Sequence, residues 1–227
     1  MRRRSALALF LPLIALPAAP AAASGTARPI APATSTAHSL DDRALPAPLE
    51  LRLNELDYDQ PGFDTGEFVE IVNTGTERYR LRHVALVFVN GTDSAEYRRV
   101  PLFGRLGSLR RLVVATPTVS VDPAARVIPM PLARDDVQNG SPDGVALVDT
   151  ANDLVLDALV YEGSIDDAAI DGLPDTISLM SGQPVHESDG NEIPGSICRL
   201  PDHADTDDDD HDWSACAPTP GSVNRGA

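Results

Sequence analysis

The stretch VALVFVNG, residues 84–91, decides the fold class of this chain. Its first six residues are apolar without a break and mostly β-branched or aromatic, which is typical of a strand that is buried on both faces of a sheet. Asn90-Gly91 then favours a tight hairpin turn, because both residues tolerate positive φ. We therefore predict a central strand over Val84–Asn90 that turns back into a second strand over Tyr97–Leu102.

The chain on either side of this hairpin repeats the same pattern of short apolar runs bounded by turn residues. Hardly any window has the spacing of a helix, so the pattern predicts an all-β, two-sheet antiparallel sandwich. Val145–Val148 is apolar on both faces and should lie centrally, whereas Leu49–Leu56 alternates and should leave one face in water. Turns are predicted at 142–144 and 151–153. The other strands are predicted over Leu49–Leu56, Phe68–Asn73, Arg111–Ala115, Arg126–Pro129, Val145–Asp149, Leu154–Tyr161 and Ser196–Leu200.

Residues 1–23 predict a secretory signal peptide, because three arginines precede an apolar stretch that prolines interrupt and that ends in small residues. An uncleaved N-terminal anchor is the alternative, although the stretch is too short to span a bilayer as a helix. Residues 24–48 are rich in Ala, Pro, Thr and Ser and predict a disordered linker. Residues 49–227 should form one domain without a membrane span. We expect a secreted protein, extracellular or at the cell surface, with the periplasm as an alternative.

Charge restricts the partners of such a protein. The chain has 18 basic residues, all arginine, against 34 acidic ones, which gives a net charge of −16. Cleavage after residue 23 would remove three arginines and no acid, so the charge becomes 15 − 34 = −19. A surface this negative repels phosphate, and the arginines form no cluster along the sequence. We therefore expect neither nucleic acid nor an anionic membrane as a partner, and an unidentified protein or surface ligand instead.

Two cysteines, Cys198 and Cys216, predict a disulfide, because exported proteins rarely keep a single pair of thiols reduced. Closing the loop between them contributes about 3 kcal/mol of stability in the chain-entropy description. Two free structural thiols are the alternative. Trp213, the single tryptophan, lies beside this pair in sequence and is expected to fill the core rather than to bind a ligand.

Two acidic segments predict cation sites, because crowded carboxylates repel one another and calcium takes six to eight oxygen ligands. Neither segment has the spacing of an EF-hand, and a solvated acidic loop is the alternative for both. His203 and His211 flank the second segment, where a transition-metal site with Asp207 is a further alternative. The candidate calcium ligands are Asp57, Asp59, Asp64 and Glu67 in the first segment, and Asp205, Asp207, Asp209, Asp210 and Asp212 in the second.

Four motifs carry a resemblance to a known family. Asn54-Glu55-Leu56, GEFVEIVN at 66–73, SICR at 196–199 and TPGSVN at 219–224 resemble the lamin tail domain as it occurs in exported bacterial proteins. The resemblance covers roughly residues 49–226. It implies an immunoglobulin-like β-sandwich that serves as a non-catalytic interaction or surface module. It does not imply filament assembly, because no coiled-coil heptads precede the domain.

Little in the sequence supports an enzyme. The chain has no Gly-x-Ser-x-Gly elbow, no His-Glu-x-x-His and no phosphate-binding glycine loop. We therefore expect a non-catalytic module for protein interaction or adhesion, with the long connection 162–195 and the loop 198–216 supplying contacts. The alternative is a secreted hydrolase whose carboxylates act on a polysaccharide or a peptide.

Overall fold

The computed structural model of the chain describes residues 50–226 except 187 and 190–194, so the predicted signal peptide and linker lie outside the described residues. All but one of the elements in the described part are strands, which confirms the predicted all-β class. None of its helices is long and apolar enough to cross a membrane. The elements are β1 (Leu51–Asp57), β2 (Phe68–Asn73), β3 (Tyr79–Arg80), β4 (Val84–Asn90), β5 (Ala95–Pro101), β6 (Arg105–Leu106), β7 (Arg111–Ala115), β8 (Arg126–Pro129), β9 (Asp143–Asp149), β10 (Leu154–Tyr161), β11 (Ser196–Arg199), α1 (Asp209–Asp212) and β12 (Trp213–Cys216).

The predicted strands are present, and β2, β4, β7, β8 and β10 have the predicted bounds. The predicted turn at 142–144 is wrong in part, because Asp143 and Gly144 already pair with β10 as the first residues of β9. The sequence pattern missed β3, β6, α1 and β12. Each of these elements has four residues or fewer, which is too short for a periodicity to show.

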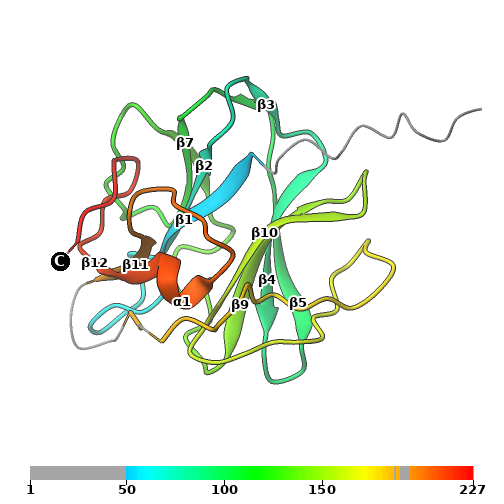
Figure 1. Cartoon of the computed structure of the whole chain (residues 1–227). Coiled ribbons are helices and arrows are strands. Elements are labelled where there is room, and N and C mark those ends of the chain that lie inside the picture. Colours follow the sequence, from blue (N-terminus) through cyan, green and yellow to red (C-terminus); the bar gives the residue numbers. More distant parts are fainter. Residues whose placement is uncertain (1–49, 187, 190–194, 227) are drawn as a thin grey trace, which may run out of the picture. The chain divides into compact units, whose positions relative to one another are not determined.

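The strands form three sheets (Figure 1). The largest has the order β12-β11-β1-β2-β7-β8, the second has the order β10-β9-β4-β5, and β3 pairs with β6 alone. The prediction of a purely antiparallel arrangement is wrong at one edge, where β8 lies parallel to β7. Two parallel neighbours need a connection that crosses back to the start of the sheet. Here that connection packs Val119 and Val121 against Phe68 and Val113.

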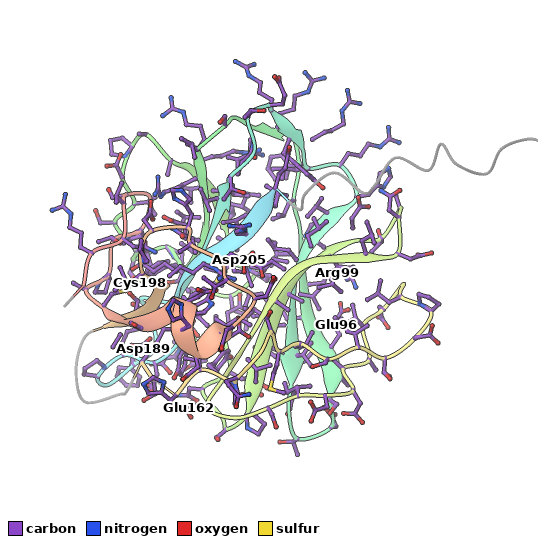
Figure 2. The ribbon with its side chains drawn as sticks, viewed as in Figure 1. Glu96, Arg99, Glu162, Asp189, Cys198 and Asp205 are labelled. Atoms are coloured by element: carbon purple, nitrogen blue, oxygen red, sulfur yellow. A yellow bond between two sulfur atoms is a disulfide. The ribbon has the colours of Figure 1, made fainter. Side chains whose placement is uncertain are left out.

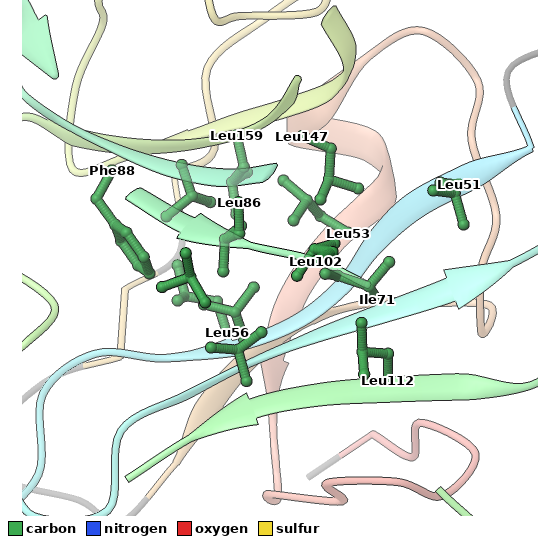
Figure 3. Packing of buried hydrophobic residues seen from close by; sticks show 14 of the residues in the cluster. Leu51, Leu53, Leu56, Ile71, Leu86, Phe88, Leu102, Leu112, Leu147 and Leu159 are labelled. Carbon is green, nitrogen blue, oxygen red and sulfur yellow. The ribbon is translucent and has the colours of Figure 1, made fainter. Parts of the chain in front are cut away.

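One apolar cluster joins the two larger sheets (Figure 3). Leu53, Ile71 and Leu112 come from the six-stranded sheet, while Leu86 and Leu147 come from the four-stranded one. Each of these side chains is at most 1% exposed, and burying a leucine or isoleucine contributes about 1.5–3 kcal/mol. In the four-stranded sheet β4 and β9 are the two inner strands, as the apolar runs Val84–Val89 and Val145–Val148 predict.

The outer face of the four-stranded sheet is buried as well, under the connection that follows β10. The described part of 162–195 lies along the sheet, where Ala169 forms a bridge with Ala95 and Ala168 forms one with Ile177. This connection therefore acts as a structural cover, and its presence explains why β4 and β9 are apolar on both faces. The second cluster contains Ala85, Val87, Val89, Ala146, Val148 and Val160 of the sheet with Ile165, Ala168, Ile170 and Leu179 of the cover.

The predicted wet face of β1 is wrong. Asn54 is fully buried, and Arg52 is only partly exposed. A bulge between Leu53 and Glu55 interrupts the register with β2, and segments near 199–205 and 219–224 cover the outward side. The cover is held by hydrogen bonds rather than by apolar contact, so an alternating sequence pattern does not reveal it.

Candidate functional site

The acidic loop 200–212 lies between β11 and β12, which pair as an antiparallel hairpin. Cys198 and Cys216 stand on these two strands with Cα atoms 6.2 Å apart and sulfur atoms at bonding distance. The predicted pairing of the two cysteines is therefore confirmed. Trp213 is fully buried in the central core, which confirms its predicted role as a core residue.

Two aspartates of this loop, Asp209 and Asp212, are buried and accept hydrogen bonds. The carboxylate of Asp209 accepts the backbone N–H of Ser181 at 2.9 Å, so it fastens the start of α1 to the sheet cover. Asp212 accepts the backbone N–H of Thr206 at 2.7 Å and its hydroxyl at 2.8 Å, and it pairs with Arg199 at 3.2 Å. Both carboxylates thus hold the loop in shape.

The other predicted ligands of the loop point to separate partners. Asp205 pairs with Arg52 at 3.1 Å, and Asp210 contacts His186. Asp207 is exposed and has a positive φ of 60°. Repulsion between the carboxylates of this loop is therefore reduced largely because most of these carboxylates have their own hydrogen-bond donor or cation. These partners come from several elements of the fold.

Arg199 is the centre of this network, although it is only 1% exposed. Its guanidinium group donates to the carbonyl oxygen of Leu53 at 2.9 Å and to that of Ala204 at 3.0 Å. It also lies 5.0 Å from the ring centroid of Trp213. A planar group with five N–H donors suits such a site, because lysine has a single ammonium group and cannot reach all of these acceptors.

The same guanidinium group neutralises two carboxylates, one buried (Asp212) and one partly buried (Asp157). It lies 3.3 Å from Asp157 on β10 and 3.2 Å from Asp212. Burial raises the pKa of Asp157 to about 6, and the charge of Arg199 limits this rise. For Asp212 burial acts in the same direction, but the hydrogen bonds from Thr206 and the charge of Arg199 lower its pKa overall. Arg199 therefore joins β11, β10 and the acidic loop electrostatically.

Two buried glutamates bind the C-terminal segment to the six-stranded sheet. Glu55 on β1 accepts the backbone N–H of Thr219 at 2.7 Å and its hydroxyl at 2.8 Å. Glu70 on β2 accepts the backbone N–H of Gly221 at 2.7 Å. Carboxylates form strong hydrogen bonds of this kind, so each contact is expected to contribute more than a neutral one.

The amide of Asn224 completes this attachment. It donates to the backbone oxygen of Asn54 at 2.8 Å and to that of Arg199 at 3.1 Å, while the Asn54 amide donates to Glu70 at 2.7 Å. The four motifs that resemble the lamin tail domain thus meet in one buried polar network. Their polar residues serve the architecture of the domain.

The first group of predicted calcium ligands is divided between different tasks. Both oxygens of Glu67 accept backbone N–H groups of residues 136–137 at 2.8–3.0 Å, so this buried carboxylate holds a loop. Asp59 and Asp64 both accept the side-chain amide of Asn139, at 3.3 and 3.2 Å. These two carboxylates do lie near each other, as the sequence spacing suggests.

Asp57 instead meets Asp189, a residue that the sequence did not single out. Asp189 accepts the backbone N–H groups of Tyr58 at 2.8 Å and Asp59 at 3.2 Å. The Tyr58 hydroxyl donates to Glu162, and Figure 2 labels Glu162 and Asp189 on the same side of the domain. Asp189 is 2% exposed, and one of its oxygens finds no N–H or O–H donor in the described chain.

Burial favours a protonated form of the Asp57–Asp189 pair. Asp57 and Asp189 are buried neighbours, and two charged carboxylates in such a site repel each other. Burial raises the pKa of both, and the neighbouring charge of Asp189 raises that of Asp57 further. No arginine of the described chain pairs with either residue. At neutral pH the pair therefore holds at least one proton.

These buried acids predict an unusual pH dependence of stability. Burial raises the pKa of Glu67 and of Glu70 to about 7. The folded chain then binds more protons than the unfolded chain between the ordinary carboxyl pKa, about 4, and pH 7. Protonation of these glutamates therefore contributes fully to the free energy of unfolding below about pH 4. This contribution is lost as the pH rises through about 7. We expect urea denaturation to give a falling free energy of unfolding across this interval.

An Asp57→Asn variant tests the contribution of the pair. It removes a titrating group while keeping the buried shape, so the dependence on pH should become shallower. Asp166→Asn serves as the control, because Asp166 is exposed and should leave the dependence unchanged. A free energy of unfolding that rises from about pH 4 to about pH 8 would contradict this account.

The described residues contain no group of three or more His, Cys, Asp and Glu side chains that converge as metal ligands. His203 contacts Asp202 at 3.1 Å, while His211 contacts Asp212 at 3.3 Å, so the two histidines serve different carboxylates. Calcium binding in either acidic segment stays a prediction.

Comparison with known proteins adds no assignment. No protein-family model matches this chain, and a search of curated proteins found no match.

Proposed function

We propose that this chain is an exported, non-catalytic module with an immunoglobulin-like β-sandwich fold. In this proposal it mediates protein interaction or adhesion at the cell surface or outside the cell. Two sheets with a common apolar core support the fold, and so does the resemblance to the lamin tail domain. The observation that carries the function is the use of the motif residues. Glu55, Glu70 and Arg199 are buried in structural bonds, which leaves exposed loops and charged surfaces for binding.

The hydrolase alternative requires a pair of accessible carboxylates in a hollow. Asp64 and Asp143 line one hollow of about 310 Å³, and burial raises the pKa of each. However, the two oxygens of Asp143 accept the backbone N–H groups of Gly91 and Gly140, both at 3.0 Å. A carboxylate used in this way fixes two turns and has little freedom to act on a substrate, which favours the non-catalytic proposal.

A substrate screen separates the two functions. Purified protein is incubated with glycosidase, peptidase and nuclease substrates, with and without calcium, and we expect no turnover above a buffer control. Turnover that an Asp64→Asn or Asp143→Asn change abolishes would establish the hydrolase instead. For the module, a tagged chain should capture a partner from the native cell surface, and the same tag alone should not.

We also propose that calcium stabilises the acidic loops, most directly at Asp59 and Asp64, whose carboxylates share one amide donor. The melting temperature of chelator-treated protein should then rise when calcium is added at millimolar concentration, and an Asp64→Asn variant should respond less. An unchanged melting temperature and no heat of binding in calorimetry would end this proposal.

A further inference from the structure

Five exposed arginines gather on the small β3–β6 sheet and the turns beside it. The arginines form no cluster along the sequence, but the pairing of β3 with β6 brings two separate segments together. In Figure 2 nitrogen-tipped side chains project from the end of the domain where Figure 1 labels β3. We name this surface the arginine ribbon, and its members are Arg78, Arg80, Arg82, Arg105 and Arg110.

The arginine ribbon has no neutralising partner within the described chain. None of its five guanidinium groups donates a hydrogen bond or joins an ion pair there. By contrast, Arg52, Arg98, Arg99, Arg111 and Arg199 each pair with a carboxylate. In a chain with a net charge of −16, unpaired arginines that collect in one place are available for an external anion.

The backbone places two of these charges against each other. Arg80 and Arg105 are direct partners in the register of β3 and β6. Like charges at such opposed positions lie about 5 Å apart at Cβ and are destabilising. A bound anion would relieve this repulsion, and arginine forks bind carboxylates with two parallel hydrogen bonds.

The inward side chains hold the ribbon in place. Tyr79 and Leu106, the neighbouring pair in the same register, face the interior. Both pack on the central core together with Leu81. The side-chain amide of Asn73 donates to the backbone oxygen of Leu106 at 2.9 Å. The arginines are therefore presented by an anchored backbone, which reduces the entropy that binding costs.

The spacing of the ribbon indicates what kind of anion fits. Exposure alternates from residue 78 to residue 82, so Arg78, Arg80 and Arg82 share one face at a two-residue period. In an extended chain this period is about 6.6 Å, the same as that of alternate side chains in another extended peptide. Phe103 and Leu109 lie nearby in the chain, are 59% and 56% exposed, and offer apolar contact that a polypeptide partner can use.

We propose that the arginine ribbon binds an extended, acidic polypeptide segment of a partner protein, with carboxylates at alternate positions of that segment. This inference rests on the proposed interaction function and assigns a surface to it. Recognition depends on the five guanidinium groups, so it weakens as salt rises.

The test measures binding of a labelled peptide of alternating Asp and Ser by fluorescence anisotropy. The Arg80→Glu/Arg105→Glu variant keeps like charges opposite each other, and Arg134→Glu/Arg225→Glu is a control with the same change in net charge at other exposed positions. We expect the ribbon variant to bind at least about tenfold more weakly at about 50 mM salt, and the control to change less than about twofold. Thermal melting checks that both variants are folded.

Several outcomes would overturn the assignment. These are the absence of peptide binding by the unmodified chain at low salt, equal losses in the two variants, and tighter binding of an oligonucleotide of equal charge. Self-association that the ribbon variant abolishes would make a second copy the occupant, because the chain has an acidic run of its own at 205–210. If the ribbon variant still captures the native partner, the interaction function stands and this surface fails.

Discussion

The Arg199→Ala variant should lose about 3–5 kcal/mol of its free energy of unfolding, the largest effect expected for any single exposed or buried charge in this domain. The change leaves the carboxylates of Asp157 and Asp212 without their common cation in a buried site. It also leaves the backbone oxygens of Leu53 and Ala204 without a donor. Urea denaturation gives the free energy, and the melting temperature should fall by on the order of 10 °C.

Two further variants show whether charge alone explains this loss. Arg199→Lys keeps the charge but not the planar fork, so it should recover only part of the stability. Arg134→Ala removes an arginine that is 58% exposed and paired with Asp135, and it should change stability by less than about 0.5 kcal/mol. A loss below about 1 kcal/mol for Arg199→Ala would contradict a central role for this residue.

Removing the cysteine pair should have the second largest effect. In the Cys198→Ala/Cys216→Ala variant the loop of 17 intervening residues is open in the unfolded state, which gives that state more conformational entropy. We expect a loss of about 3 kcal/mol by urea denaturation. The domain should still fold, because Glu55 and Glu70 bind the C-terminal segment independently of the sulfur atoms.

Reductant provides the control for this experiment. It should destabilise the unmodified chain by a similar amount and leave the variant unchanged. If reductant affects both proteins equally, the loss does not come from the disulfide. If the variant does not fold at all, the hydrogen bonds of Glu55 and Glu70 contribute less than the structure implies.

The pattern of apolar residues predicted the strands because burial in a sheet has a local signature. β4 is apolar at every position but the last, and the structure places it inside a sheet with apolar clusters on both faces. The cover over the second face comes from 162–195, whose mixed composition gave no sign of it. The side chains that complete that cluster, such as Ile165 and Leu179, are spaced too irregularly to read as an element.

The polar side of the domain was harder to predict, because hydrogen bonds between distant segments follow no period. Arg52 and Asn54 alternate with leucines and look solvent-facing, yet they are covered by loops from the other end of the chain. Asp57 was grouped with near neighbours in sequence, whereas the fold pairs it with Asp189. Arg199, which follows Ile197 and Cys198 at the end of β11, was the available signal for the buried network.

The arginine ribbon, too, could not be predicted from the sequence pattern. Arg80 and Arg105 lie on strands of two residues each, and such strands leave no mark in a sequence window. Only the register of β3 with β6 reveals that the two arginines are neighbours. Clusters of charge should therefore be judged after folding, and not from their distribution along a chain.

The position of β1 has a consequence for biosynthesis. β1 lies between β2 and β11, and the last described motif, at 219–224, is fastened to it. A polypeptide that leaves the ribosome from its N-terminus cannot complete this sheet until β11, β12 and the motif at 219–224 have emerged. The domain therefore stays incomplete until that motif has been synthesised, and an incompletely folded chain is the state that a narrow translocation pore requires.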